Sequence, residues 1–401
     1  MHAPVEYHFF TGYSLRSWLV LGGFGLLAAL AGLAAMYMES EGHWVTGMTN
    51  HVVWGLPHVF AFFFIISASG ALNVASIGSV FGREDYQPLG RLSAVLAFAL
   101  LAGGLSVLVF DLGRADRLII TMEYINPTSI FAWNVFIYQI FFGLVIIYLW
   151  MMMDPRMTAF YRPAGTAAFL WRLFMTTGTG SVLGFLVSRA AFRSAVMAPE
   201  FIALSLSFGT AIFALVLLAL QRFEGRPVPT PALRARLSRL LGLLVAISLY
   251  FVAVQHGTGL YQAERRDVEH FLLFQGGLYS VLIWGGFVVL GSVLPMMLLF
   301  DPLRAGQHGA LPIASALIVF GGLCLIYATV IGGEAFPIEI FPGMHVTSSA
   351  FDGAVHPYAP SLPELALGLG AVGVAGVVLL MAMWVLPLLP DTAGSDSPAG
   401  P

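Results

Sequence analysis

Residues 130–152 read IFAWNVFIYQIFFGLVIIYLWMM, a run without a single charged side chain. About 20 apolar residues are enough for an α-helix to cross a hydrocarbon core of about 30 Å. The run therefore predicts a membrane-spanning helix, and the whole composition agrees with it. Of the 401 residues, 58% are hydrophobic and only 10% are charged, whereas charged residues make up about 25% of a soluble domain.

Similar apolar segments lie on both sides of this run, and together they predict an all-α integral membrane protein with about ten transmembrane helices. The first segment is long and lacks a small-residue cleavage site, so we do not interpret it as a signal peptide. A ten-span domain at 18–388 would be flanked by tails at 1–17 and 389–401. The ten segments are 18–38, 52–77, 92–110, 130–152, 166–187, 201–221, 239–260, 271–299, 311–331 and 364–388.

Two parts of this domain resemble each other at an offset of about 148 residues. Arg-Leu pairs at Arg91 and Arg239 open the third and seventh segments, and Asp-Pro pairs at Asp154 and Asp301 follow the fourth and eighth. Internal repeats are common in membrane folds. The repeat predicts a four-helix bundle within 18–187 and another within 201–331, flanked by helices 1 and 10. Chance similarity between apolar sequences is the alternative.

The charged residues are distributed unequally between the two sides of the predicted membrane domain. An even number of spans places both termini on one side, together with twelve of the 18 arginines. The positive-inside rule then predicts cytoplasmic termini in a multi-pass protein of the inner (cytoplasmic) membrane. The other side holds 13 of the 21 acidic residues and the long loops 111–129 and 332–363. We expect a partner on this acidic face, although the arginine bias alone could explain its charge.

Cys324 is the only cysteine in the chain. A single cysteine excludes an intrachain disulfide, a cysteine-ligated iron–sulfur cluster and a CxxCH haem site. We therefore expect no metal centre that belongs to the chain itself. If the protein moves electrons, they must pass through a partner's centres or a diffusible carrier.

The few polar groups within or beside the predicted spans gather near the outer end of the first bundle. An ionisable side chain in the membrane costs about 2.5–3.5 kcal/mol or more, so each is a candidate functional residue. Asn134 and Tyr138 lie on one helix face because they are four residues apart. The candidates are His58, Asp111, Arg114, Tyr124, Asn134 and Tyr138.

This combination of side chains suits a quinone. Its two carbonyl oxygens need hydrogen-bond donors and a group that passes protons, and its isoprenoid tail needs an apolar slot. Each residue also has a structural explanation. Tyr138 could be an interfacial aromatic residue, Asn134 could join two helices, and Asp111 could pair with Arg114 at a helix end. His58 could be an interfacial histidine whose hydrogen bonds are satisfied locally.

Two further features have alternative interpretations. His58 and His256 could together ligate haem b if spans 2 and 7 touch, although we do not expect this arrangement. A run of small and hydroxyl-bearing residues in the fifth span predicts close helix packing or, alternatively, a hydrated proton path. Its hydroxyl groups belong to Thr176, Thr177, Thr179 and Ser181.

The block DLGRADR at 111–117, followed by NPTSIFAW at 126–133, resembles the signature of the NrfD/PsrC (polysulfide reductase membrane subunit) family. The usual form there is DLGRPxR followed by S-x-x-x-W, and Ala115 here replaces the usual proline. The runs GLPHVF at 55–60, SGALNVAS at 69–76 and FPIEIFPG at 336–343 are most similar to the DsrP branch of the DsrMKJOP sulfur-metabolism complex. HybB-type hydrogenase subunits are near relatives of that branch.

The resemblance implies a subunit without a cofactor of its own that binds menaquinone or ubiquinone near the outer face. It implies electron exchange with a periplasmic ferredoxin-like iron–sulfur protein, within a complex that also contains DsrM-, DsrK-, DsrJ- and DsrO-like subunits. It places the quinone pocket in the first bundle, near Asp111, Arg114, Asn134 and Tyr138. We add His58 because of its depth in the second span.

These inferences combine into one hypothesis, a quinone-reactive subunit that does not turn over alone and serves dissimilatory sulfur metabolism. Tyr138 and His58 would hydrogen-bond the quinone, and Asp111, held by Arg114, would pass protons to the periplasm. The alternatives are a secondary transporter or proton-translocating subunit, a HybB-type hydrogenase subunit, and a passive anchor without a quinone site. A transporter would show broken helices and charges at the bilayer centre, and the sequence shows neither clearly.

Overall fold

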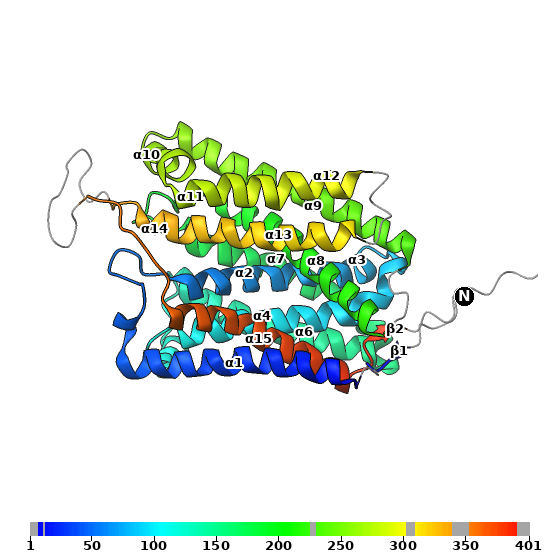
Figure 1. Ribbon diagram of the computed structural model, residues 1–401. Helices are drawn as coiled ribbons and strands as arrows, with labels where there is room; N and C mark the ends of the chain where they lie inside the picture. Colours follow the sequence, from blue (N-terminus) through cyan, green and yellow to red (C-terminus); the bar gives the residue numbers. More distant parts are fainter. Residues whose placement is uncertain (1–6, 11–12, 225–229, 302–308, 339–352, 391–401) are drawn as a thin grey trace, which may run out of the picture.

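Long helices lie side by side along the whole molecule in the computed structural model, which describes residues 7–10, 13–224, 230–301, 309–338 and 353–390 (Figure 1). Helices are the expected solution in hydrocarbon because they satisfy every backbone polar group within one segment. The first half contains α1 (Leu15–Glu41), α2 (Leu56–Ala71), α3 (Asn73–Ser79), α4 (Gly90–Phe110), α6 (Ile130–Met153) and α7 (Tyr161–Gly184).

The second half contains the remaining long helices, and three segments of its described residues are π-helical. Its long elements are α8 (Met197–Glu224), α9 (Pro231–Tyr261), the π-helix η6 (Leu282–Val293) between α11 (Leu278–Val281) and α12 (Leu294–Phe300), α13 (Ala310–Tyr327) and α15 (Leu362–Val385). The short elements are the 3-10 helix η1 (His43–Val45), α5 (Leu118–Glu123), α10 (Arg266–His270), α14 (Gly333–Ala335), and the π-helices η5 (Phe271–Gln275) and η7 (Ala328–Gly332).

Nine helices in the described part of the chain are long and apolar enough to cross a membrane. The predicted span at 166–187 corresponds to α7, which has 24 residues but does not reach the same apolarity. Arg162, Arg172 and the polar run at 176–181 account for this difference. The all-α integral membrane fold is confirmed, with nine spans recognisable by composition and α7 packed among them.

Each half of the chain forms a ring of four helical segments. In the first bundle, α2 with α3, α4, α6 and α7 pack in a closed ring, and in the second α8, α9, η6 with α12, and α13 do the same. Helix α8 joins the bundles because it packs against both α2 and α7. Helix α15 lies on α2 and α4, and α1 lies outside it (Figure 1). Both flanking helices therefore cover the first bundle.

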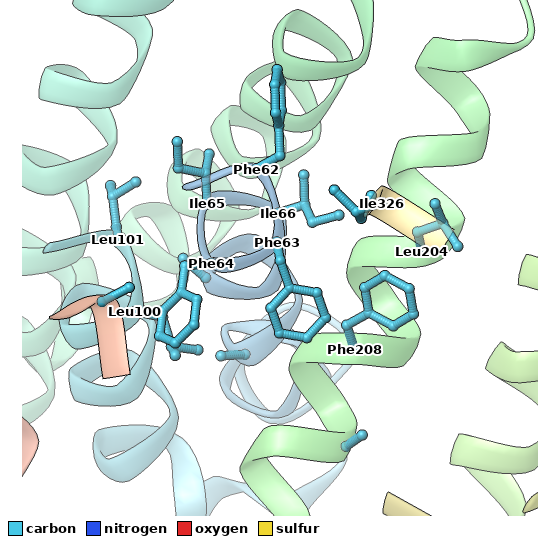
Figure 2. Close-up of a cluster of buried hydrophobic side chains, with 14 of the residues drawn as sticks. Phe62, Phe63, Phe64, Ile65, Ile66, Leu100, Leu101, Leu204, Phe208 and Ile326 are labelled. Carbon is cyan, nitrogen blue, oxygen red and sulfur yellow. The ribbon is translucent and has the colours of Figure 1, made fainter. Parts of the chain in front are cut away.

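The contact between the bundles is closest where two glycines face each other. A Cβ atom on Gly70 of α2 would overlap the backbone oxygen of Ser205, and one on Gly209 of α8 would overlap the backbone at Ala71. Small residues of this kind let helix backbones approach in membranes. Around this crossing, aromatic and aliphatic side chains from α2, α4, α8 and α13 interdigitate, including Phe63 and Phe208 (Figure 2).

The second span, Leu56–Ser79, has a one-residue irregularity at Leu72 between α2 and α3, where the backbone stays in the right-handed helical region. The last carbonyl groups of a helix lack partners within it, and here side chains supply them. Arg172 of α7, only 1% exposed, donates to the Ser69 carbonyl oxygen at 3.1 Å and to Asn73 Oδ1 at 3.4 Å. The sequence showed neither broken helices nor charges at the bilayer centre clearly, and the structure adds a buried arginine, Arg172, in the fifth span.

The two ends of the described chain meet at one end of the molecule. The short strands β1 (Tyr7–His8) and β2 (Leu389–Pro390) pair antiparallel there, and we call this the terminal end. The opposite end, here the distal end, carries η1, α5, α10 and α14 (Figure 1). Parts of the predicted tails and of the predicted 332–363 loop, at 1–6, 11–12, 339–352 and 391–401, lie outside the described residues.

Candidate functional site

Two histidines converge on one aspartate at the distal end of the first bundle. Asp111 follows the last residue of α4, and His58 lies in the first turn of α2. The His58 Nδ1 atom is 2.8 Å from Asp111 Oδ2. His43 of η1 lies 3.7 Å from Asp111 Oδ1 and contacts the Asp111 carbonyl oxygen at 3.1 Å through the same Nε2 atom. We call these three residues the His–Asp–His cluster.

Local sequence explains how these side chains meet. Pro57 occupies the first turn of α2, where its missing N–H costs no helical hydrogen bond, and His58 follows it directly. After Asp111 the chain turns sharply at Gly113, whose φ angle is +69°. A Cβ atom there would lie 2.9 Å from the His43 ring. Glycine is needed at this position both for the backbone conformation and for the approach of His43.

The cluster consists of a buried carboxylate and two histidines that lie nearer to the surface of the protein. The Asp111 side chain is 1% exposed, compared with 15% for His58 and 32% for His43. Burial alone would raise the pKa of Asp111, but the two imidazoles beside the carboxylate outweigh it and hold the pKa below its ordinary value. The neighbouring Asp111 carboxylate in turn raises the pKa of His43.

Aromatic rings form one side of the cluster. The Trp54 ring stacks at 6.0 Å from the His58 ring and at 6.0 Å from Phe192. Phe62 and Phe131 meet the same indole edge-on. Trp54 thus presents a flat apolar surface beside the His58 imidazole and the buried Asp111 carboxylate. A ligand with an aromatic ring and polar substituents needs apolar and polar groups side by side in this way.

Two buried carboxylates fix the loop at 47–56 that carries Trp54. Glu364 accepts hydrogen bonds from Gly47 N, Ser361 N and Tyr358 Oη, each at 2.7 Å. Glu334 accepts one from Trp54 N at 2.9 Å. We did not predict either residue as part of the site. Ser361 and Glu364 have the spacing of a capping box, which signals a helix start but not a contact with residues about 300 positions away.

Arg114 and Tyr124 do not join the cluster in the way we predicted. Arg114 pairs with Asp116 instead of Asp111, through two hydrogen bonds of 3.0 Å. The turn at Gly113 directs the chain outward, and Asp116 is then the acid that the guanidinium reaches. The Tyr124 side chain is 78% exposed, and the described residues show no contact between it and His58 or Asp111. The expected support of Asp111 by Arg114 is therefore replaced by support from the two histidines.

Asn134 and Tyr138 lie on the same side of α6, as predicted from their spacing, and both side chains contact α7. Asn134 Nδ2 donates to the Gly178 carbonyl oxygen at 3.1 Å, and Tyr138 Oη lies 3.1 Å from Thr179 Oγ1. Both side chains are buried. These contacts join two helices of the first bundle, which favours the structural explanation of these residues over direct contact with a quinone.

The hydroxyl groups of the fifth span mostly bond to their own helix. Thr176, Thr177 and Thr179 donate to the carbonyl oxygens of Arg172, Leu173 and Met175, four residues earlier. This is the ordinary back-bonding of threonine in helices, and Ser181 is buried beside them. These contacts support close helix packing as the role of the run, rather than a hydrated proton path.

His58 and His256 lie in different bundles. Helix α8 packs between α2 and α9, and each imidazole faces a carboxylate, Asp111 for His58 and Glu269 for His256. Haem ligation by these two histidines would need spans 2 and 7 to touch. The packing instead places α8 between them. Within the described ranges, no group of three or more histidine, cysteine or acidic side chains could hold a metal ion.

Comparisons with known proteins give one family and several similar membrane subunits of redox enzymes. The family described as "Polysulphide reductase, NrfD" matches residues 44–338. The chain is 26% identical to the "Hdr-like menaquinol oxidoreductase integral membrane subunit" of Archaeoglobus fulgidus, over 92% of this chain and 94% of the relative. It is 24% identical to a selenate reductase subunit of Mesobacillus selenatarsenatis, over 90% of this chain and 92% of the relative. It is 25% identical to a "Putative dimethyl sulfoxide reductase membrane subunit" of Halobacterium salinarum, over 94% and 93%.

Proposed function

The chain belongs to the polysulphide reductase NrfD family, and on that premise we propose that it is the quinone-reactive membrane subunit of a multi-subunit redox complex. The observation that carries the proposal is the His–Asp–His cluster beside Trp54, buried at the distal end of the first bundle. Quinol oxidation releases two protons with two electrons. A site for it needs a proton acceptor next to an apolar slot, and the cluster supplies the acceptor.

The contacts assign a role to each member of the cluster. Because His58 Nδ1 faces Asp111 at 2.8 Å, a neutral His58 carries its proton there and keeps Nε2 as an acceptor. A quinol hydroxyl donates to this nitrogen, and the Asp111 carboxylate stabilises the imidazolium that forms. His43, which is 32% exposed, connects the buried carboxylate to the surface. In this proposal Asp111 passes protons, as predicted from the sequence. The two histidines support it in place of Arg114, and His58 contacts the quinol without Tyr138.

The distal surface beside the cluster suits a protein partner. No residue of α5 is buried, and large apolar side chains are exposed on and after this helix, including Ile119, Ile120 and Trp133. We propose that an iron–sulfur protein docks here and takes the electrons. With cytoplasmic termini in the inner membrane, this face is periplasmic and the partner is the predicted ferredoxin-like protein.

The finer assignment of the complex is also a proposal. A relative named for menaquinol oxidation supports menaquinone over ubiquinone as the carrier. Within the family we propose a DsrP-type role in sulfur metabolism, with DsrM-, DsrK-, DsrJ- and DsrO-like partners, which rests on the sequence runs at 55–60, 69–76 and 336–343.

Labelling the assembled complex in its native membranes with a photoreactive menaquinone analogue tests the proposal. We expect cross-links at residues 52–62 and 107–113, the segments that hold Trp54, His58 and Asp111, and we expect excess unlabelled menaquinone to suppress them. Asp116→Asn, which alters only an exposed ion pair, is the matched control and should label like the wild type. Labelling confined to α9 or to the outer face of α1 would contradict the assignment.

The pH dependence of quinol oxidation should report on His43. His43→Gln removes an imidazole that helps to hold the pKa of Asp111 down, so burial then raises that pKa. The carboxylate becomes protonated at a higher pH, and the acidic limb of the pH–rate profile should move to higher pH. His270→Gln, a substitution of an exposed distal histidine in the second bundle, should leave the limb in place. An unchanged acidic limb in His43→Gln would remove His43 from the site.

A second candidate function is proton or solute translocation, and the buried Arg172 of α7 favours it. Ionisable side chains inside membrane-spanning segments often mark ion, proton or substrate pathways. Purified protein alone in liposomes should then carry out transport without any redox partner. The quinone-reactive subunit should not, and this separates the two candidates.

A further inference from the structure

A second cluster of buried ionisable groups lies at the distal end of the second bundle, away from the proposed quinone site. Glu200 of α8, Glu269 of α10 and Arg265 just before it are each no more than 3% exposed. Arg265 Nη2 donates to Glu269 Oε1 at 2.8 Å, and His256 Nδ1 of α9 lies 2.6 Å from Glu269 Oε2. No step of the proposed quinone chemistry uses these residues.

One oxygen of this cluster has no hydrogen-bond partner among the described residues. Glu200 Oε2 is fully buried and unpartnered, which is costly for a carboxylate unless it is protonated or bound to a ligand. Glu200 lines a small cavity of about 10 Å³, which is also lined by Gln255, His256 and Glu269. About one water molecule fits a cavity of this size.

The backbone around the cavity is also unusual. Leu272 belongs to the π-helix η5, Ile283 to η6, and Thr329 to η7, and all three line the cavity. π-Helical segments are rare in proteins, and they occur frequently at functional sites. Three of them meeting at one polar cavity indicate that the cavity is built by the fold and is not a packing defect.

The charges of the cluster determine how many protons it holds. Arg265 and Glu269 neutralise each other, which leaves Glu200 and His256. An uncompensated charge is costly at such a buried site, so the neutral cluster carries one proton between these two groups, either on the carboxyl or on the imidazole. His256 directs Nδ1 to Glu269, so its Nε2 is the nitrogen that gains or loses the proton.

We propose that the second bundle contains a buried proton-relay site, in which Glu200 and His256 share one exchangeable proton across the water-sized cavity. Arg265 and Glu269 are positioning residues that hold the imidazole. The ligand of the site is a proton, carried by water or hydronium, since the cavity is too small for a quinone. The charged groups that face Glu200 are His256 of α9, and Arg265 and Glu269 in and beside α10.

The relay also has a counterpart in the first bundle. His58 and Asp111 lie at the start of the second span and the end of the third, and Glu200 and His256 lie at the start of the sixth and near the end of the seventh. The acid and the base lie on opposite helices in the two bundles. A protonatable pair therefore lies at the distal end of each bundle, one beside an aromatic surface and one at a small cavity.

Infrared difference spectroscopy of the purified complex in H₂O and ²H₂O tests the relay. The wild type should show a carbonyl band of a protonated carboxylic acid that shifts in ²H₂O and changes with pH. Glu200→Gln should abolish this band, while Glu264→Gln, which alters an exposed distal glutamate paired with Arg193, should retain it. His256→Asn should change the pH at which the band appears.

The outcomes separate this site from the proposed quinone site. Asp111→Asn should leave the band intact, because Asp111 belongs to the other bundle. If Glu200→Gln does not assemble, Glu200→Asp provides the same measurement, with the band retained but shifted. A wild-type complex without an exchangeable carboxylic-acid band, or a band that persists unchanged in Glu200→Gln, would overturn the proposal.

Discussion

Asp111→Asn is expected to slow quinol oxidation by the assembled complex about 10²–10⁴-fold, the range that a positioned acid or base contributes to a reaction. Asparagine keeps the size of the side chain but cannot stabilise a positive charge on His58, whose Nδ1 faces the carboxylate at 2.8 Å. Electron transfer from a menaquinol analogue to the partner's iron–sulfur centre is the measurement, with complex assembly checked in parallel.

Two substitutions are matched controls for Asp111→Asn. Asp116→Asn removes an exposed carboxylate of the same loop and should leave the rate unchanged. Tyr138→Phe removes the contact with Thr179, which should weaken helix packing by about 0.6 kcal/mol and leave the rate near that of the wild type. A near-normal rate in Asp111→Asn, or a large loss in Tyr138→Phe, would contradict the site described here.

Gly209→Val is expected to separate the two bundles. A Cβ atom at this position meets the backbone of α2 at Ala71, Gly70 and Ser67, and backbone cannot move aside as a flexible side chain does. Overpacking costs about 1–3 kcal/mol where side chains can adjust, so we expect a loss at or above the upper end of that range. Thermal unfolding and size-exclusion profiles of the detergent-solubilised protein measure it.

Gly257→Val is the matched control for this substitution. Gly257 is also in a long helix, but a Cβ atom there has no neighbour within 4 Å. The same change of side chain should therefore leave the unfolding temperature nearly unaltered. Equal unfolding temperatures for the two variants would show that the α2–α8 crossing does not determine stability.

Apolar runs and their lengths were enough to predict the helical membrane fold. In hydrocarbon a single segment can satisfy its backbone hydrogen bonds only as a helix, so an apolar run such as 130–152 is enough to predict a helix. The repeat of Arg-Leu and Asp-Pro pairs predicted two groups of four helices. The span predicted at 166–187 corresponds to α7, whose arginines and threonines make it less apolar than the nine spans recognised by composition in the described ranges.

The candidate site was predictable only in part. Asp111 and His58 were identified because ionisable groups within or beside a span are rare, and the structure brings them together. His43 was missed because a histidine in a loop has no periodicity that signals its position. Glu334 and Glu364 were missed because their contacts join residues about 300 positions apart.

What the amino-acid sequence determined by itself was the set of helices, because burial of apolar side chains and satisfaction of backbone hydrogen bonds in hydrocarbon are local requirements. Only the tertiary structure decided which polar groups meet, since a hydrogen bond of about 3 Å depends on how the helices cross and where each begins. The pairing of Asp111 with two histidines, the contact of Arg172 with the Ser69 carbonyl oxygen, and the cavity beside Glu200 all arise from such crossings.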